Sequence, residues 1–339
     1  MTGLAALTRD IVAGRAGNPA AAAALLLDPA TPETEVAGYL TAKAVAGAEP
    51  ADVEALAHVV LAAATRVPFD GRASDLVGTG GDGSGSVNIS TLAALLAAVV
   101  AKAGNRAATS RCGSADLLEK LGVEIDPGPE GIAQSLRDNG FAFVLTPAVH
   151  PVVGNLAPLR RRLGFPTLFN LTGPMTDPVA TGARIIGVAG ERDQAVMAEA
   201  AARLELSPAW LVRAENGMDE MSTSGRTRIL AVEDGMVRKF ELDPREIGAY
   251  EARPEELLGG GPDTNASIAR AVLGGQASPG LLDTCALNAA ALVAVAACPA
   301  DPMGELVHQL KRVRDALAQG MPARLLSVLT NSHTWKEIH

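Results

Sequence analysis

A glycine-rich stretch at residues 77–91, VGTGGDGSGSVNIST, holds the residue types best able to bind an anion. It follows a short apolar run, Asp75–Val77, that we interpret as a buried strand, and it leads into an alanine- and leucine-rich run that predicts a helix from about Ser90. Glycine lets the backbone pass close to a ligand, and the free N–H groups at a helix start favour phosphate. The spacing matches neither GxGxxG nor GxxxxGK followed by Ser or Thr. The stretch therefore predicts a phosphate site, with a tight structural turn as the alternative.

Two adjacent carboxylates, Asp219 and Glu220, follow an apolar run at Trp210–Val212. Magnesium prefers oxygen ligands and keeps several waters, so a carboxylate pair together with substrate phosphates is a normal way to hold it. The pair predicts a magnesium site beside the phosphate site. The alternative is an ordinary solvated loop.

Short apolar runs alternate with helical stretches through the middle of the chain. Runs that are apolar throughout are typical of strands buried on both faces of a parallel sheet. Thr227–Val232 and Met236–Leu242 flank an Asp-Gly turn and predict an antiparallel hairpin. We therefore expect an α/β fold with a mixed, mainly parallel sheet, whose strands include residues 75–77, 141–145, 184–188 and 210–212, followed by helices at 265–273, 281–297 and 302–318.

The first 70 residues predict short helices separated by Asn18-Pro19, Asp28-Pro29 and Glu49-Pro50. In one of them Val36, Tyr39, Leu40 and Ala44 recur at helical spacing. This segment is too short to form a core alone, so we expect the apolar stripe to pack into a homodimer interface or the domain junction.

Composition limits the class of protein. The 339 residues carry a formal net charge of −9 and only 3% aromatic residues, which disfavours binding to a nucleic acid backbone. Three widely spaced cysteines, Cys112, Cys285 and Cys298, support neither a disulfide framework nor a zinc site. With no targeting or membrane-spanning pattern either, we expect a cytoplasmic protein with no membrane or nucleic acid partner.

Several longer motifs resemble the anthranilate phosphoribosyltransferase family. In chain order they are VGTGGDGSGSVNIST, KAGNRAATSRCGSADLLEKLG, HPVVGNLAPLRRRLG, TLFNLTGPMTDP and ENGMDEMS. The resemblance implies a small helical domain at residues 1–70, with a contribution from about 160–182, and a large α/β domain at 71–339. It also implies a homodimer formed through the helical part and Mg²⁺, in two ions, bound with phosphoribosyl pyrophosphate as donor. The reaction would be the transfer of phosphoribose to anthranilate in tryptophan biosynthesis.

The resemblance carries individual site residues onto this chain, and it assigns no catalytic residue beyond the donor and metal ligands. The implied donor residues are Gly78, Gly81, Asp82, Ser86, Asn88, Ile89, Ser90, Thr91, Lys102, Ser110 and Ser114. The implied acceptor residues are Gly78, Ala103, Asn105, His150 and Arg160, and the implied metal ligands are Ser90, Asp219 and Glu220. In this reading the guanidinium of Arg160 pairs with the acceptor's carboxylate, and His150 either orders a turn or lines the acceptor channel.

The chain departs from the family pattern at the acceptor side. The family's Lys-His-Gly-Asn-Arg reads Lys102-Ala103-Gly104-Asn105-Arg106, and the segment between Thr91 and Lys102 is about four residues shorter than usual. Losing the histidine would widen the pocket and remove a polar contact. The acceptor is therefore anthranilate or, alternatively, another aromatic acid or amine in a specialised pathway. A non-catalytic relative that binds another ligand or nucleic acid is the alternative of a different class.

Overall fold

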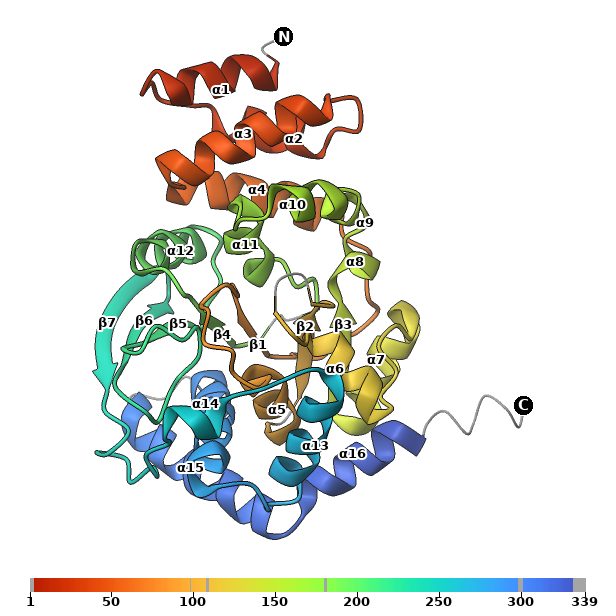
Figure 1. The fold of residues 1–339 in the computed structure, drawn as a ribbon, viewed down its shortest axis with the longest axis vertical. Helices are drawn as coiled ribbons and strands as arrows, with labels where there is room; N and C mark the ends of the chain where they lie inside the picture. Colours follow the sequence, from red (N-terminus) through yellow and green to blue (C-terminus); the bar gives the residue numbers. More distant parts are fainter. Residues whose placement is uncertain (1–2, 98, 108–109, 180–181, 298–300, 332–339) are drawn as a thin grey trace, which may run out of the picture.

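The computed structural model describes residues 3–97, 99–107, 110–179, 182–297 and 301–331. Figure 1 shows a cap of N-terminal helices above a sheet, with the C-terminal helices on its far side. The strands are β1 Asp75–Gly78, β2 Val100–Gly104, β3 Phe141–Leu145, β4 Arg184–Gly187, β5 Ala209–Ala214, β6 Thr227–Glu233 and β7 Met236–Leu242.

The helices before β4 are α1 Leu4–Val12, α2 Pro19–Leu27, α3 Glu33–Ala46, α4 Pro50–Ala62, α5 Ile89–Leu96, α6 Ser114–Leu121, α7 Gly128–Asn139, α8 Thr146–Val149, α9 Pro151–Gly154, α10 Ala157–Leu163 and α11 Leu168–Thr172. Those after β4 are α12 Glu191–Arg203, α13 Pro262–Leu273, α14 Pro279–Ala297, α15 Pro302–Ala318 and α16 Met321–Asn331. Two 3₁₀ turns, Gly173–Met175 and Pro254–Leu257, complete the described elements.

The strands form a mixed, mainly parallel arrangement, which confirms the predicted fold class. One sheet has the order β1-β4-β5-β6-β7, and β2 pairs with β3 in a separate two-stranded sheet. The β1–β4, β4–β5 and β2–β3 pairs are parallel, whereas β5–β6 and β6–β7 are antiparallel. A parallel bridge between Ser74 and Val100 joins the two sheets beside β1. The carboxyl ends of β1, β2, β4 and β5 therefore point the same way, toward one edge where loops can form a site.

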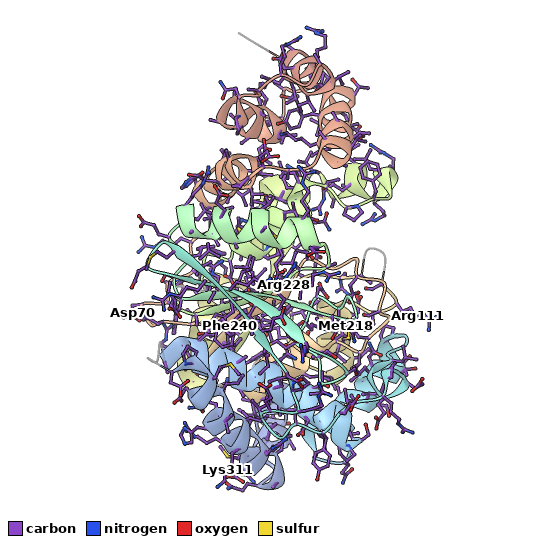
Figure 2. All side chains as sticks on the ribbon, turned by 90° about the vertical axis from the view of Figure 1, so that its left-hand side faces the viewer. Asp70, Arg111, Met218, Arg228, Phe240 and Lys311 are labelled. Atoms are coloured by element: carbon purple, nitrogen blue, oxygen red, sulfur yellow. The ribbon has the colours of Figure 1, made fainter. Side chains whose placement is uncertain are left out.

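Helices cover both faces of the larger sheet, as Figure 2 shows from the side, with α12 over the strands and the C-terminal helices beneath them. One hydrophobic cluster combines α5, α6, α13, α14 and α15 with the lower face, where Trp210 packs edge-on against Phe240 at a centroid distance of 5.2 Å. Burial on both faces explains why these strands read as unbroken apolar runs.

The N-terminal helices share a second cluster with α10, α11, α12 and the upper face of the sheet. Val36, Tyr39 and Leu40 of α3 are buried in this cluster by other parts of the same chain, while Ala44 is exposed. The three buried residues therefore need no second protomer to cover them.

The α14 helix is the only described helix long and apolar enough to cross a membrane, and 78% of its 18-residue window is buried inside the molecule. A core helix passes the same test, so this is weak evidence for a membrane span.

Candidate functional site

The glycine-rich loop leaves the end of β1 and returns to the start of α5. Gly80, Gly81, Gly83 and Gly85 all have a positive φ, between 65° and 80°, and all four are exposed. Residues other than glycine rarely adopt this conformation, so the glycines allow a loop with exposed backbone here. Residues 79–88 thus form an exposed, glycine-rich loop between β1 and α5.

Hydrogen bonds join the glycine-rich loop and the start of α5 to the acidic pair, which lies at least 130 residues further along the chain. The N–H of Gly80 donates to Oδ2 of Asp219 at 2.7 Å, and the N–H of Ser90 donates to Oε1 of Glu220 at 3.1 Å. The N–H of Asp219 approaches Oδ2 of Asp82 at 3.4 Å. The structure therefore brings together the metal residues and part of the donor residues that the sequence predicted.

Two glycines allow the acidic pair to sit so close to the sheet. A Cβ on Gly78 would lie 2.3 Å from Oδ2 of Asp219, and a Cβ on Gly187 would lie 1.4 Å from its backbone oxygen. Neither distance is possible for real atoms. Gly78 at the end of β1 and Gly187 at the end of β4 thus leave the space that the segment at Asp219 fills.

The acidic pair is buried, with Asp219 only 8% and Glu220 only 9% exposed. Burial, followed by the nearby charge of Asp82, raises the pKa of Asp219 to about 6. Burial and the charge of Asp219 also raise the pKa of Glu220 well above its usual value. Oε2 of Glu220 is buried without a hydrogen-bond partner among the described residues. A cation would relieve both the charge and the unpaired oxygen.

The described residues contain no group of three His, Cys, Asp or Glu side chains placed to hold a metal by themselves. The acidic pair is therefore an incomplete set of ligands. This fits Mg²⁺, which keeps waters and takes substrate phosphates as ligands, better than it fits a metal held in an all-protein cage.

Charged residues lie buried beneath the loop. Lys102 is 2% exposed, and its Nζ donates to the carbonyl of Ala103 at 2.6 Å. Burial lowers the pKa of Lys102 below its usual value. Nearby carboxylates, of which Asp75 has the largest effect, oppose this shift but do not cancel it. Oδ1 of Asp75 accepts the N–H of Ala103 at 3.2 Å. Lys102 thus lies behind the acidic pair, away from solvent.

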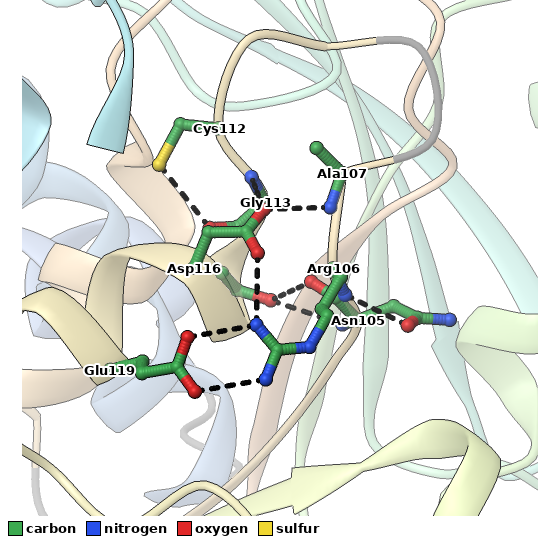
Figure 3. A network of polar contacts seen from close by, with 8 residues as sticks. Asn105, Arg106, Ala107, Cys112, Gly113, Asp116 and Glu119 are labelled. Carbon is green, nitrogen blue, oxygen red and sulfur yellow. Dashed lines mark hydrogen bonds and ion pairs between the residues drawn. The ribbon is translucent and has the colours of Figure 1, made fainter.

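A second loop, between β2 and α6, carries further predicted residues (Figure 3). Arg106 pairs with Asp116 and Glu119 on α6, and Oδ2 of Asp116 accepts the N–H groups of Ala107 and Gly113 at 2.8 and 2.9 Å. The hydroxyl of Ser114 lies 3.2 Å from the N–H of Asn105. These contacts hold Asn105 and Ser114 side by side at the carboxyl end of β2.

The other predicted donor residues differ in their exposure. Asn88 bridges the loops, because its Nδ2 donates to the carbonyl of Cys112 at 3.0 Å and its Oδ1 accepts from Asn265 at 2.9 Å. Ser86 and Ser110 are on the loops themselves, where Ser86 is half-buried and Ser110 exposed. The side chains of Ile89 and Thr91 are fully buried in α5 and do not reach the exposed side of the loop.

The predicted acceptor residues do not all face one opening. Ala103 is buried near the end of β2, and Asn105 is exposed. His150 is buried, and its Nε2 donates to the carbonyl of Thr176 at 2.7 Å. This contact favours the reading of His150 as a residue that orders a turn.

Arg160 is the predicted acceptor residue with the clearest free charge. It is half-buried in α10, and its guanidinium lies over the ring of Phe169, 5.3 Å from the centroid. Burial lowers its pKa. Within the described parts of the chain no carboxylate forms an ion pair with Arg160, whereas Arg162 in the same helix pairs with Glu33. Arg160 is thus a cation without a counterion.

Sequence reasoning missed residues whose roles depend on distant partners. Asp75 belongs to the apolar run at Asp75–Val77, and a charged residue in a predicted buried strand is a signal that could have identified it as a site residue. Asn170 lies within the motif TLFNLTGPMTDP, which received no role. Gly187 has no local signal, because only the approach of Asp219 explains it.

A glycine loop over a buried acidic pair, at the carboxyl ends of parallel strands, is typical of α/β enzymes that bind phosphorylated substrates. Residues 70–323 match the family model described as a glycosyl transferase family, α/β domain. The anthranilate phosphoribosyltransferase of Saccharopolyspora erythraea is 40% identical over 330 residues, covering 95% of this chain and 93% of the relative. The protein belongs to the anthranilate phosphoribosyltransferase family, as its motifs indicated.

Solved structures agree with this assignment. The anthranilate phosphoribosyltransferase of Thermus thermophilus superposes with a TM-score of 0.87 and 36% identity, covering 96% of this chain and 98% of that one. The Saccharomyces cerevisiae enzyme, solved in complex with phosphoribosyl pyrophosphate and magnesium, has a TM-score of 0.87 at 26% identity, with 97% of each chain covered.

Proposed function

We propose that this protein transfers phosphoribose from phosphoribosyl pyrophosphate to the amino group of anthranilate, as a Mg²⁺-dependent pentosyltransferase of tryptophan biosynthesis. The observation that carries the proposal is the buried acidic pair, Asp219 and Glu220, bound to the backbone of a glycine loop. The family membership and the magnesium and donor named for the yeast relative support it.

The glycine loop suits the departing group of this reaction. The bond between ribose C1 and the pyrophosphate oxygen breaks, which leaves positive charge on the sugar and negative charge on pyrophosphate. The backbone N–H groups of the exposed glycines Gly81, Gly83 and Gly85, in the loop that leads into α5, can stabilise that negative charge. Gly81, Ser86 and Asn88 lie on the glycine loop, and Ser114 begins α6 at the end of the second loop; both loops would face the donor.

A cation would be held by the carboxylates of Asp219 and Glu220, with Ser90 beside them. When bound, Mg²⁺ supplies positive charge to the pyrophosphate oxygens. We propose two ions, as the resemblance to the family implies.

The acceptor needs little chemical activation. The nitrogen of an arylamine is neutral near pH 7, so it can form the bond to ribose C1 and then release its proton without a strong base. The half-buried Arg160, which has no counterion among the described residues, suits the carboxylate of anthranilate. Binding there would orient the amine toward the donor.

The identity of the acceptor is tested by steady-state kinetics with a panel of aromatic amines. We expect anthranilate to have the highest kcat/KM, with ring-substituted anthranilates accepted as well because Ala103 replaces a histidine. Ala103→His should narrow this range, since one group in a pocket is worth about 1–3 kcal/mol. An equal loss for every acceptor would show that Ala103 does not face the acceptor. A higher kcat/KM for another aromatic acid or amine would favour the specialised pathway.

The remaining expectations are part of the same proposal. We propose that the protein is a cytoplasmic homodimer with no nucleic acid or membrane partner. Each chain would have a helical domain at 1–70, with a contribution from about 160–182, and an α/β domain at 71–339. Val45 and Phe165, which are exposed and line a groove of about 420 Å³ beside α3 and α11, support an interface on the helical part. Light scattering at micromolar concentration should give twice the chain mass, and a strict monomer would contradict the dimer.

A further inference from the structure

One motif of the sequence, TLFN at Thr167–Asn170, lies between the two halves of the site. It forms the first turn of α11, with Thr167 at the N-cap position, and Oδ1 of Asn170 accepts the N–H of Thr167 at 2.9 Å. This hydrogen bond turns the side chain of Asn170 back toward the helix start.

The same oxygen also contacts the predicted acceptor residue. Nη2 of Arg160 donates to Oδ1 of Asn170 at 3.2 Å, while Nδ2 of Asn170 approaches the carbonyl of Thr79 in the glycine loop at 3.5 Å. Two donors on the oxygen and a carbonyl near the nitrogen fix which way the amide points. Asn170 therefore joins the guanidinium on α10 to the loop that follows β1.

The environment of Arg160 leaves the rest of its guanidinium available. Phe169 covers one face of the group, and Nε is buried without a partner among the described residues. A neutral amide can orient a guanidinium without cancelling its charge, whereas a carboxylate in the same place would form an ion pair with it. An asparagine at 170 thus suits a cation that must stay free for an anionic ligand.

We propose that Asn170 is a positioning residue that orients Arg160 toward the carboxylate of the acceptor and keeps the arginine's charge unpaired. This rests on the proposed function, because it assigns Arg160 to the acceptor. It predicts that substitution of Asn170 changes the KM for the acceptor more than the KM for the donor.

The test separates this role from simple capping of α11. Asn170→Asp keeps the capping oxygen, so a residue that only caps would give wild-type kinetics. If Asn170 positions Arg160, the new carboxylate pairs with the guanidinium and competes with the acceptor. We then expect the KM for anthranilate to rise at least tenfold and the KM for phosphoribosyl pyrophosphate to change less than twofold.

A double-mutant cycle completes the experiment. On an Arg160→Ala background, Asn170→Asp should change kcat/KM for anthranilate less than twofold, because its partner is gone. Asn155→Asp, the same change at an exposed asparagine directly after α9, is the matched control and should behave as wild type.

Three results would overturn the inference: unchanged acceptor KM in Asn170→Asp, an equal rise in donor KM, or additive losses in the double mutant. Each of these requires an active wild type and leaves the proposed function standing. A wild type that does not ribosylate anthranilate would instead overturn the proposed function and this inference with it.

Discussion

Asp219→Asn should make the metal-free protein more stable, although it removes a residue of the proposed metal site. The carboxylate is buried, and burial together with Asp82 raises its pKa from 3.8 to about 6. At 1.36 kcal/mol per pKa unit, a rise of about two units costs the folded state about 3 kcal/mol when the group is ionised. Asparagine keeps an oxygen for the N–H of Gly80 without the charge. We therefore expect a gain of about 1–3 kcal/mol at pH 7.

The sign of the pH dependence follows from the same shift. Because the folded pKa lies above the unfolded value, the group's contribution to stability is fully present below about pH 4 and is lost as the pH rises through about 6. Glu220, whose pKa is also raised, acts in the same direction. The advantage of Asp219→Asn should therefore vanish at pH 4 and be largest above pH 6.

The assay is chemical denaturation of the metal-free protein at pH 4 and pH 7, followed by thermal shifts with phosphoribosyl pyrophosphate and Mg²⁺. We expect Mg²⁺ to raise the melting temperature of the wild type with donor and to have a much smaller effect on Asp219→Asn. Asp234→Asn, in the exposed β6–β7 turn, is the matched control. A variant that is less stable than wild type at pH 7, or that responds fully to Mg²⁺, would refute the reasoning.

Two further predictions concern residues that support the site and the fold around it. Gly187→Ala should cost more than about 3 kcal/mol of folding free energy or prevent folding, because its Cβ would overlap the carbonyl oxygen of Asp219. Gly173→Ala has open space around it and should be tolerated, so comparable denaturation midpoints for the two variants would contradict this prediction. Asp283→Ala should lose about 3 kcal/mol, since the buried carboxylate accepts from both Nε and Nη2 of Arg314, and a loss below about 1 kcal/mol in urea denaturation would argue against it.

Local pattern was enough to predict much of the fold. The buried strands appear as apolar runs because both faces are covered, and the β6–β7 hairpin turns at Asp234 and Gly235, whose φ values of 49° and 73° suit an Asp-Gly pair. The strand β2 is harder to recognise because Lys102 lies inside it. The charge of Lys102 is compensated by Asp75 on β1 and by carboxylates in distant loops. Apolar runs therefore predict most of the strands, and the strand that they do not predict contains a buried charged residue.

Partners distant in the sequence explain what local pattern missed. By its length, the segment that carries Val36, Tyr39 and Leu40 is too short to form a core alone. In the structure, α10, α11 and α12 contribute to the hydrophobic cluster that buries these residues. The close approach of Asp219 to Gly187 joins residues whose spacing carries no periodic signal. Such contacts depend on the tertiary arrangement, which a single sequence does not display.

The proposed transfer of phosphoribose is tested most simply by following pyrophosphate release and product mass in one reaction of the purified protein with phosphoribosyl pyrophosphate, Mg²⁺ and anthranilate. We predict one pyrophosphate for each molecule of N-phosphoribosyl anthranilate, and no product when the metal is chelated. Pyrophosphate release that does not depend on anthranilate, or the absence of a ribosylated anthranilate by mass, would contradict the assignment.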